Sequence, residues 1–238
     1  MVSAAVDMLL IEGRAGDRCP AHCGGAVSPL TAEFLRGDAV INEDNHADSA
    51  ERPFRILLVC EANVCRSPMA EYLLRKILTD QGVDASAFEV ISAGIHADDG
   101  ETMDPRTVEQ LVRLDVSPNG FRFHTLTDGD LDDADLILTA TRAQRSMLLE
   151  RVPTALRRSF TMLEFAQTAR QVRSRWPKVR DPKDLVRLTA ATRGSVPVPE
   201  YDIADPVGGS VKVHRSTADV TLDAVQAISG ALVRLPAS

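Results

Sequence analysis

The sequence has few cysteines, few aromatic residues and no long apolar run. Four cysteines in 238 residues are too few for a disulfide framework, so we expect a reducing cytoplasm as its location. Aromatic residues make up only 4% of the chain, which argues against a surface that stacks on bases or sugars. No stretch approaches the roughly 20 apolar residues of a membrane helix, and Asp7 interrupts the apolar start of the chain. We therefore expect a soluble globular protein with no membrane partner.

An excess of basic residues is also lacking. The formal net charge is -7, which argues against a general nucleic-acid binder. Residues 1–50 contain 8 Asp and Glu against 3 Lys and Arg, and they show no sustained hydrophobic period. We predict that residues 1–52 form an acidic, disordered extension and that residues 53–238 form the folded domain.

From residue 54 onwards, short apolar runs alternate with longer stretches in which apolar residues recur at helical spacing. Short runs are typical of buried strands, and longer stretches with helical spacing follow each of them. Strands are predicted over 54–60, 88–92, 134–139 and 159–162, and helices over 68–82, 105–114, 142–151 and 210–235. This alternation predicts an α/β fold, a three-layer sandwich with a central four-stranded parallel sheet flanked by helices. Residues 169–200, rich in Arg, Lys and Pro, are predicted to be a helical insertion that ends in a polyproline-like linker.

The loop between the first strand and the first helix contains the residues best suited to chemistry. Cys60 ends the strand, Arg66 lies six residues later, and Ser67 and Pro68 begin the helix. Backbone N–H groups in such a loop and the start of a helix together form an anion site. Arg66 adds a planar fork of donors for two phosphate oxygens. The same positive field favours the thiolate of Cys60, which would then be a nucleophile directed at phosphorus.

The stretch VCEANVCRSP at 59–68 resembles the signature of the low-molecular-weight protein tyrosine phosphatases. The similarity extends through SAG at 92–94, MDPR at 103–106, ADLIL at 134–138 and DP at 205–206, and covers roughly residues 54–235. The resemblance implies a phosphotyrosine-protein phosphatase that needs no cofactor and forms a phosphocysteine intermediate on Cys60.

The same resemblance implies a role for each residue of the site. Cys60, Arg66 and Asp205 would be catalytic, with Asp205 as the general acid. Asn63, Ser67 and Ser92 would support the loop. The substrate-binding loop would comprise Glu61, Ala62, Asn63, Val64, Cys65, Arg66 and Ser67.

Two positions depart from the family pattern. Ala62 stands where the family usually has Gly, so the loop would follow a different path if that position required a positive φ. Val207 follows Asp205-Pro206, where the family often has an aromatic residue, which weakens the prediction of phosphotyrosine as the substrate. If Asp205 is not the acid, Asp181 is the next candidate, because it too precedes a proline ahead of the final helix.

The remaining cysteines and histidines are ambiguous. Cys65 could trap an oxidised Cys60 as a disulfide, or it could simply pack beneath the loop. The group Cys19, His22, Cys23 and His46 does not match a standard zinc motif, and we expect no metal. We expect His96, His124 and His214 to be surface or hydrogen-bonding residues.

Two other functions compete with phosphatase activity. One is arsenate reduction on the same scaffold, which needs further cysteines downstream of the nucleophile, and the chain has none after Cys65. The other is a non-catalytic module that binds phosphate or a protein partner. Together, the intact Cys60, Arg66, Ser67 and Asp205 argue against such a module. The sequence leaves the oligomeric state and the physiological substrate open.

Overall fold

The computed structural model describes residues 52–97 and 102–233. These residues lie in the second of the two units into which the chain divides, Met1–Asp48 and Ser49–Ser238. Cys19, Cys23, His22 and His46 fall outside the described residues, and the boundary expected at residue 52 stays a prediction.

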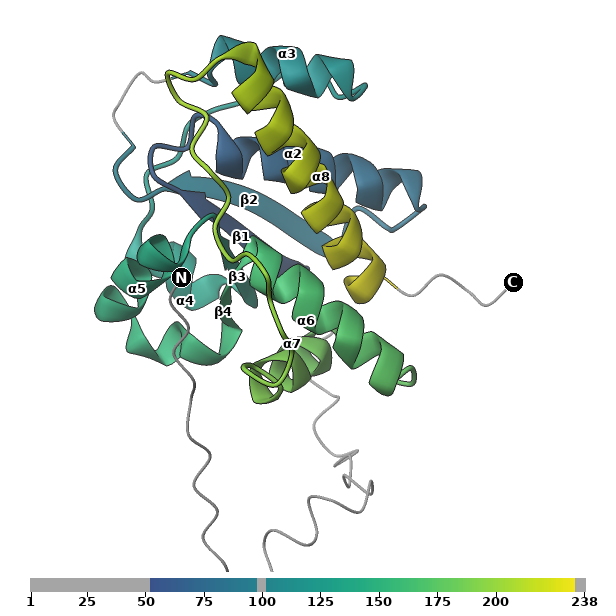
Figure 1. Cartoon of the computed structure of the whole chain (residues 1–238). Helices are drawn as coiled ribbons and strands as arrows, with labels where there is room; N and C mark the ends of the chain where they lie inside the picture. Colours follow the sequence, from purple (N-terminus) through teal and green to yellow (C-terminus); the bar gives the residue numbers. More distant parts are fainter. Residues whose placement is uncertain (1–51, 98–101, 234–238) are drawn as a thin grey trace, which may run out of the picture. The chain divides into compact units, whose positions relative to one another are not determined.

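The described residues fold around a four-stranded, fully parallel sheet with the strand order β2-β1-β3-β4 (Figure 1). The strands are β1 (Phe54–Cys60), β2 (Phe88–Gly94), β3 (Leu136–Thr139) and β4 (Ser159–Thr161). Cys60 at the end of β1 pairs in register with Gly94 at the end of β2. The predicted fold class is confirmed, and the catalytic candidates follow the carboxyl end of the central strand.

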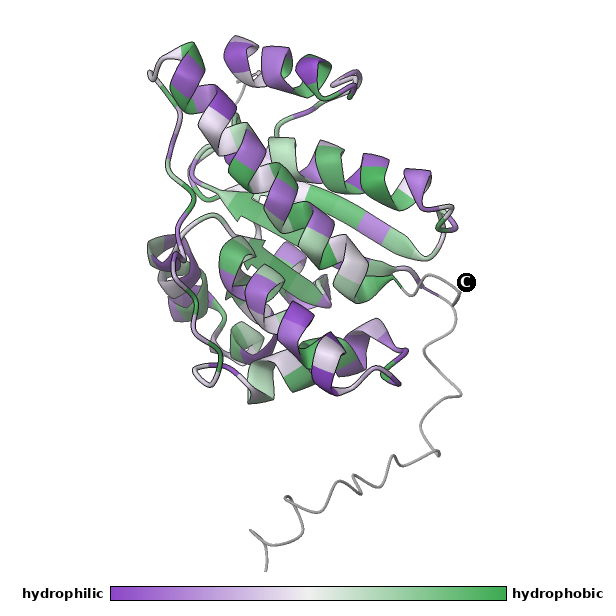
Figure 2. Cartoon of the chain, turned by 45° about the vertical axis from the view of Figure 1, so that its right-hand side comes forward, coloured by the Kyte–Doolittle hydropathy of each residue, from purple (hydrophilic) through white to green (hydrophobic). Residues whose placement is uncertain are grey.

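Side chains along β1 alternate between two hydrophobic cores. Phe54, Ile56, Leu58 and Cys60 face one core, which is completed by α2 (Arg66–Asp80), α3 (Pro105–Arg113), α6 (Met162–Arg175), α7 (Pro182–Ala191) and α8 (Val211–Leu232). Leu57 and Val59 face the other core, together with α4 (Asp128–Asp133), α5 (Arg142–Arg151) and the 3₁₀ helix η2 (Pro153–Arg158). The hydropathy colouring of Figure 2 shows mostly apolar strands between helices that carry both polar and apolar residues. This is the expected three-layer arrangement.

Most helix starts are fixed by a side-chain cap. Thr127, Thr141 and Thr161 form capping boxes at the starts of α4, α5 and α6. Asp104 and Asp181 cap α3 and α7, each followed by a proline in the first turn. Helices α2 and α8 differ, because their N-cap residues, Cys65 and Ser210, make no side-chain cap hydrogen bond.

Residues 169–200 are more integrated than the predicted insertion. Helix α6 begins at Met162, directly after β4, and buries Phe165, Ala169 and Val172 at helical spacing. Helix α7 buries Leu185 and Val186 in the same core. The polyproline-like linker stays a prediction, and only the non-helical residues after α7 could form it. No described helix is long and apolar enough to cross a membrane.

Candidate active site

The loop between β1 and α2 is a cradle of backbone N–H groups. Helix α2 begins at Arg66, two residues earlier than predicted, so Arg66 and Ser67 belong to its first turn. Among the described residues, none of the backbone N–H groups of residues 62–67 donates to a protein acceptor. Unpaired N–H groups at a helix start attract an anion through both hydrogen bonding and the helix dipole.

Asn63 holds the path of this loop. It is fully buried and adopts a left-handed φ of 57°, a conformation that Asn tolerates better than most residues. Its Nδ2 donates to Ser67 Oγ at 3.0 Å and to Ser92 Oγ at 2.8 Å, and its Oδ1 accepts from the backbone N–H of His124 at 2.9 Å. Ala62 is not among the residues with positive φ. Alanine at that position therefore causes no backbone strain.

The sulfur of Cys60 lies within a hydrogen bond of Ser67. Cys60 is 2% exposed, and its Sγ is 3.0 Å from Ser67 Oγ, which also lies 3.2 Å from the carbonyl oxygen of Ala93. A hydroxyl has one proton and so can donate to only one of these two neighbours at a time. When Cys60 is a thiol, the Ser67 hydroxyl can donate to Ala93. When Cys60 is a thiolate, the hydroxyl can turn to the sulfur.

Glu71, which was not predicted as a site residue, extends this network. Ser92 Oγ donates to Glu71 Oε2 at 2.5 Å, which completes a chain of side chains from Glu71 through Ser92, Asn63 and Ser67 to Cys60. Burial raises the pKa of Glu71 above its usual value. A sequence signal existed, because Glu71 is an acidic residue among the apolar positions of α2, one turn after Ser67.

Gly94 allows the loop to lie against β2. A Cβ atom on Gly94 would lie 2.7 Å from both the carbonyl carbon of Ala62 and the backbone nitrogen of Asn63. The N–H of Gly94 is bonded to the carbonyl of His124, the same residue whose N–H binds Asn63. Only glycine allows this close backbone approach, which gives the SAG stretch a physical reason.

Arg66 joins the loop to a segment 139 residues later. It is 5% exposed, and its Nη2 donates to Asp205 Oδ2 at 2.5 Å and its Nη1 to the carbonyl oxygen of Ile203 at 3.4 Å. Its Nε is buried and has no partner among the described residues. A buried guanidinium N–H without a protein acceptor is costly, and an oxyanion in the cradle would satisfy it.

The segment that carries Asp205 is fixed on both sides. The N–H of Ile203 donates to the carbonyl of Ala140, just after β3, at 2.8 Å, and Thr217 of α8 donates to the carbonyl of Ala204 at 3.4 Å. The Asp205 carboxylate remains 44% exposed, so it can meet a substrate from solvent. Asp181 instead caps α7 by accepting the N–H of Lys183, and the structure pairs Arg66 with Asp205.

Cys65 and the histidines complete the set of predicted residues. Cys65 is buried, and burial raises the pKa of its thiol to about 12. His96 pairs with Glu61 at 2.7 Å and His124 with Asp130 at 2.9 Å, as expected of hydrogen-bonding residues. His214 departs from that prediction, because it is fully buried and neither ring nitrogen has a hydrogen-bond partner among the described residues.

A parallel α/β sheet with a cysteine, five residues and an arginine at the start of a helix defines the class of cysteine-dependent phosphatases. The model of the low molecular weight phosphotyrosine protein phosphatase family matches residues 55–192. The chain belongs to this family, and it is a cysteine-dependent phosphatase that acts on phosphorylated protein.

Relatives of the chain include both arginine and tyrosine phosphatases by name. The chain is 29% identical over 167 residues to a protein-arginine-phosphatase of Geobacillus stearothermophilus, a match that covers 70% of this chain and 88% of that protein. It is 39% identical over 112 residues to the "Probable low molecular weight protein-tyrosine-phosphatase EpsP" of Ralstonia solanacearum, covering 47% and 72%. Among solved structures, the YwlE arginine phosphatase from Geobacillus stearothermophilus matches with a TM-score of 0.55 and 28% identity, covering 74% of this chain and 91% of that one.

Proposed function

We propose that the chain is a protein tyrosine phosphatase of the cytoplasm that works through a phosphocysteine on Cys60, with Arg66 as phosphate clamp and Asp205 as general acid. The observation that carries this proposal is the contact between Arg66 in the loop and Asp205 in the distant segment. This contact places a carboxyl group beside the guanidinium that would hold the phosphoryl group. The cradle, the nucleophile and a proton donor therefore meet at one end of β1.

The first chemical step transfers the phosphoryl group to sulfur. The Cys60 thiolate attacks phosphorus, an S–P bond forms, and the bond from phosphorus to the leaving oxygen breaks. Asp205 gives its proton to that oxygen, so the product leaves as a neutral alcohol or phenol.

The second step restores the enzyme with water. The Asp205 carboxylate now accepts a proton from water, whose oxygen attacks phosphorus as the S–P bond breaks. Inorganic phosphate forms, and the leaving thiolate of Cys60 can accept a hydrogen bond from the Ser67 hydroxyl, since the two atoms are 3.0 Å apart. The N–H groups of residues 62–67 would stabilise the charge on the phosphoryl oxygens in both steps.

Phosphoarginine is a second candidate substrate, supported by specific observations. A relative that matches 70% of this chain is named a protein-arginine-phosphatase. Val207, 57% exposed, occupies the position where the family often has an aromatic residue. Glu61, next to the nucleophile, is also exposed and would attract a guanidinium group. With phosphoarginine, the bond that breaks joins phosphorus to nitrogen, and Asp205 would protonate that nitrogen.

A pair of peptides separates the two substrates. The same peptide sequence is made once with phosphotyrosine and once with phosphoarginine, and phosphate release is measured with each under identical conditions. We expect kcat/KM to be higher for phosphotyrosine. A higher value for phosphoarginine would reverse the assignment, and no release from either peptide would contradict phosphatase action at this site. The Cys60→Ser variant is the blank for both reactions.

Arg66→Lys tests the clamp in the same assay. A lysine keeps the positive charge but cannot offer the planar fork of donors. We therefore expect kcat/KM to fall by more than about tenfold. A smaller loss would show that charge alone suffices and that the fork geometry has no role.

A further inference from the structure

His214 in α8 is a buried polar side chain with no apparent structural purpose. Its exposed fraction is 0%, and neither Nδ1 nor Nε2 has a hydrogen-bond partner among the described residues. Buried polar groups almost always have a partner, and leaving one unpaired costs free energy. The catalytic steps proposed above make no use of this imidazole.

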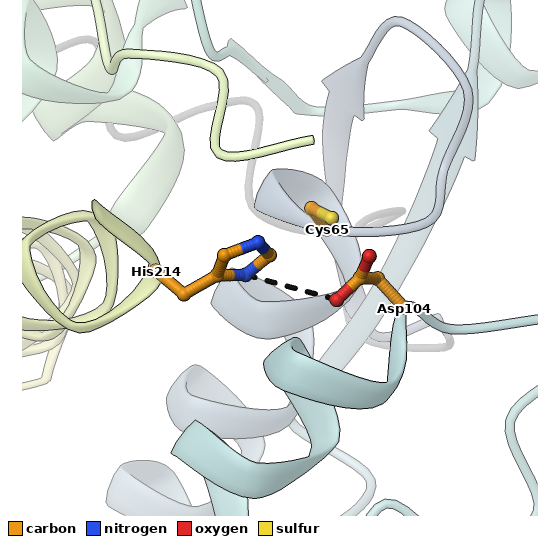
Figure 3. A group of neighbouring side chains, drawn as sticks. All are labelled: Cys65, Asp104 and His214. Atoms are coloured by element: carbon orange, nitrogen blue, oxygen red, sulfur yellow. Dashed lines mark ion pairs between the residues drawn. The ribbon is translucent and has the colours of Figure 1, made fainter. Parts of the chain in front are cut away.

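Two other metal-ligating groups lie next to His214 (Figure 3). They are Cys65, the N-cap of α2, and Asp104, the N-cap of α3, so the cluster joins three separate helices. One ligand atom from each residue lies within 4.8 Å of the other two. His214 Nδ1 is 3.7 Å from Asp104 Oδ1, too far for a hydrogen bond between them.

The spacing suits two ligands of one ion better than it suits a direct pair. Zn²⁺ takes thiolate, imidazole and carboxylate ligands at about 2.0–2.3 Å in a tetrahedron, so neighbouring ligand atoms lie roughly 3.3–3.7 Å apart. The 3.7 Å separation is measured to Asp104 Oδ1, the oxygen that caps α3, and it places the carboxylate group as a whole at ligand distance from His214. The other two separations are at most 4.8 Å.

Asp104 has an oxygen available for a metal ion. Its Oδ1 accepts the N–H groups of Arg106 and Thr107 as the cap of α3. Its Oδ2 has no hydrogen-bond partner among the described residues. Because the Asp104 side chain is 24% exposed, an ion and a water can reach the cluster from that side.

We propose that Cys65, Asp104 and His214 form a Zn²⁺ site beneath the phosphate loop, with a water molecule as the fourth ligand. On binding, a Zn–S bond forms and the Cys65 thiol proton leaves to solvent. The thiolate and the carboxylate together neutralise the ion, which lowers the free-energy cost of burying its charge. The expectation of no metal concerned only Cys19, His22, Cys23 and His46. Cys65, Asp104 and His214 are too far apart in the chain to form a recognisable motif.

The test is a metal titration of the full-length chain. Cys19→Ser and Cys23→Ser are introduced first, so that the other thiols outside the loop cannot bind the probe. Co²⁺ is added as a spectroscopic substitute for Zn²⁺, and the thiolate-to-metal absorption and the tetrahedral ligand-field bands are recorded. We expect saturation at one Co²⁺ per chain and displacement by one Zn²⁺, measured by elemental analysis after dialysis.

Substitutions assign the ligands. Cys65→Ser should abolish the thiolate absorption, and His214→Gln and Asp104→Asn should each weaken Zn²⁺ binding by about 10–100-fold or more. Asn preserves the cap of α3, so Asp104→Asn tests the carboxylate charge without removing the helix start. Asp181→Asn makes the same change at the cap of α7 and should leave binding unchanged.

Three results would overturn the proposal. They are no stoichiometric Co²⁺ binding in the background chain, unchanged Zn²⁺ affinity in both His214→Gln and Asp104→Asn, or thiolate absorption that survives Cys65→Ser and disappears in Cys60→Ser. The last result would assign the metal to the catalytic thiol. If Cys65→Ser fails to fold by circular dichroism, the other two variants still decide the question.

Discussion

At the scale of single residues, the state of the site depends on which acceptors the Arg66 guanidinium and the Ser67 hydroxyl bind. The Arg66 fork is divided between Asp205 and the carbonyl oxygen of Ile203, and its Nε has no protein partner among the described residues. The single Ser67 proton can reach either Ala93 or Cys60. Substrate binding would redistribute these donors without rebuilding the loop, because Asn63 fixes the backbone.

Asp205→Asn should slow phosphocysteine formation most for poor leaving groups. A phosphotyrosine-like or alkyl ester needs the proton, so we expect a loss of about 10²–10⁴-fold. A nitrophenyl ester should lose much less, because nitrophenolate leaves without protonation. The variant should also lose the high-pH decline of the rate profile. Pre-steady-state rates across a series of aryl phosphates measure both effects.

An Asp205 that only holds the turn before α8 would behave differently. Asp205 Oδ1 accepts the N–H of Val207 at 3.2 Å, so the substitution also perturbs that turn. A structural role predicts equal losses for all leaving groups, an unchanged pH profile and a lower melting temperature. That combination would move the acid to another residue.

Glu71→Gln should change the pH dependence of stability. Burial raises the pKa of Glu71 above 4.5, so the folded state keeps this proton to a higher pH than the unfolded state does. The contribution of the Glu71 proton to the free energy of unfolding is therefore fully present below about pH 4.5. It is lost as the pH rises through the higher folded-state pKa. The amide of the variant cannot titrate. We measure the free energy of unfolding of both proteins in urea. The value for the variant minus that for the wild type should increase from pH 4.5 towards neutral pH. A pH-independent difference would contradict a raised pKa.

At the scale of elements, the loop is held between a bare helix start and a strand end. Helix α2 lacks the side-chain cap seen at α3 to α7, which leaves its first N–H groups for an anion. The end of β2 lies against the loop because Gly94 has no Cβ. The two elements therefore set the width of the cradle.

Gly94→Ala should disturb both the loop and the stability. The new methyl group would meet the backbone of Ala62 and Asn63, which cannot rotate away as a side chain would. We expect a loss of about 1–3 kcal/mol in the free energy of unfolding, together with a fall in kcat. Gly230→Ala is the control, because its Cβ would meet nothing within 4 Å in α8 and should stabilise the helix by about 0.5–1 kcal/mol. Wild-type kcat in Gly94→Ala would show that the loop tolerates displacement.

Elements were predictable from the sequence where a local pattern dominates. The four strands and the helices after β1 and β3 follow from apolar runs and spacing. Helix α6 begins at Met162, before the predicted insertion at 169–200, because the spacing of Phe165, Ala169 and Val172 was not recognised as helical. Within the site, the loop could be predicted from adjacent residues. The roles of Glu71 and His214 could not, because they depend on contacts with Ser92 and Asp104, which are distant in sequence.

At the scale of the whole molecule, the sheet brings the two ends of the folded domain to one site. Cys60 follows β1, near the start of the domain, while Asp205 precedes its last helix. Within residues 52–97 and 102–233, both core clusters and every strand are formed from Phe54 onwards. The phosphatase activity should therefore need none of the first 50 residues.

Deleting residues 1–50 tests this domain boundary. We expect a soluble chain with kcat/KM on an aryl phosphate within about twofold of the full-length value, since the described core and site use no residue before Arg52. Circular dichroism and thermal unfolding provide the control for folding. An insoluble or inactive truncated chain would show that the first 50 residues contribute to the folded domain.

The central claim is that Cys60 accepts the phosphoryl group. The most direct measurement is mass spectrometry of peptides from enzyme that is mixed with excess aryl phosphate and quenched in acid within milliseconds. We predict phosphate on the peptide that contains Cys60. With a nitrophenyl ester, the level should be higher in Asp205→Asn than in the wild type, because loss of the base slows hydrolysis of the intermediate. Rapid product release with no phosphate on Cys60 in either protein, or full turnover by Cys60→Ser, would contradict the account.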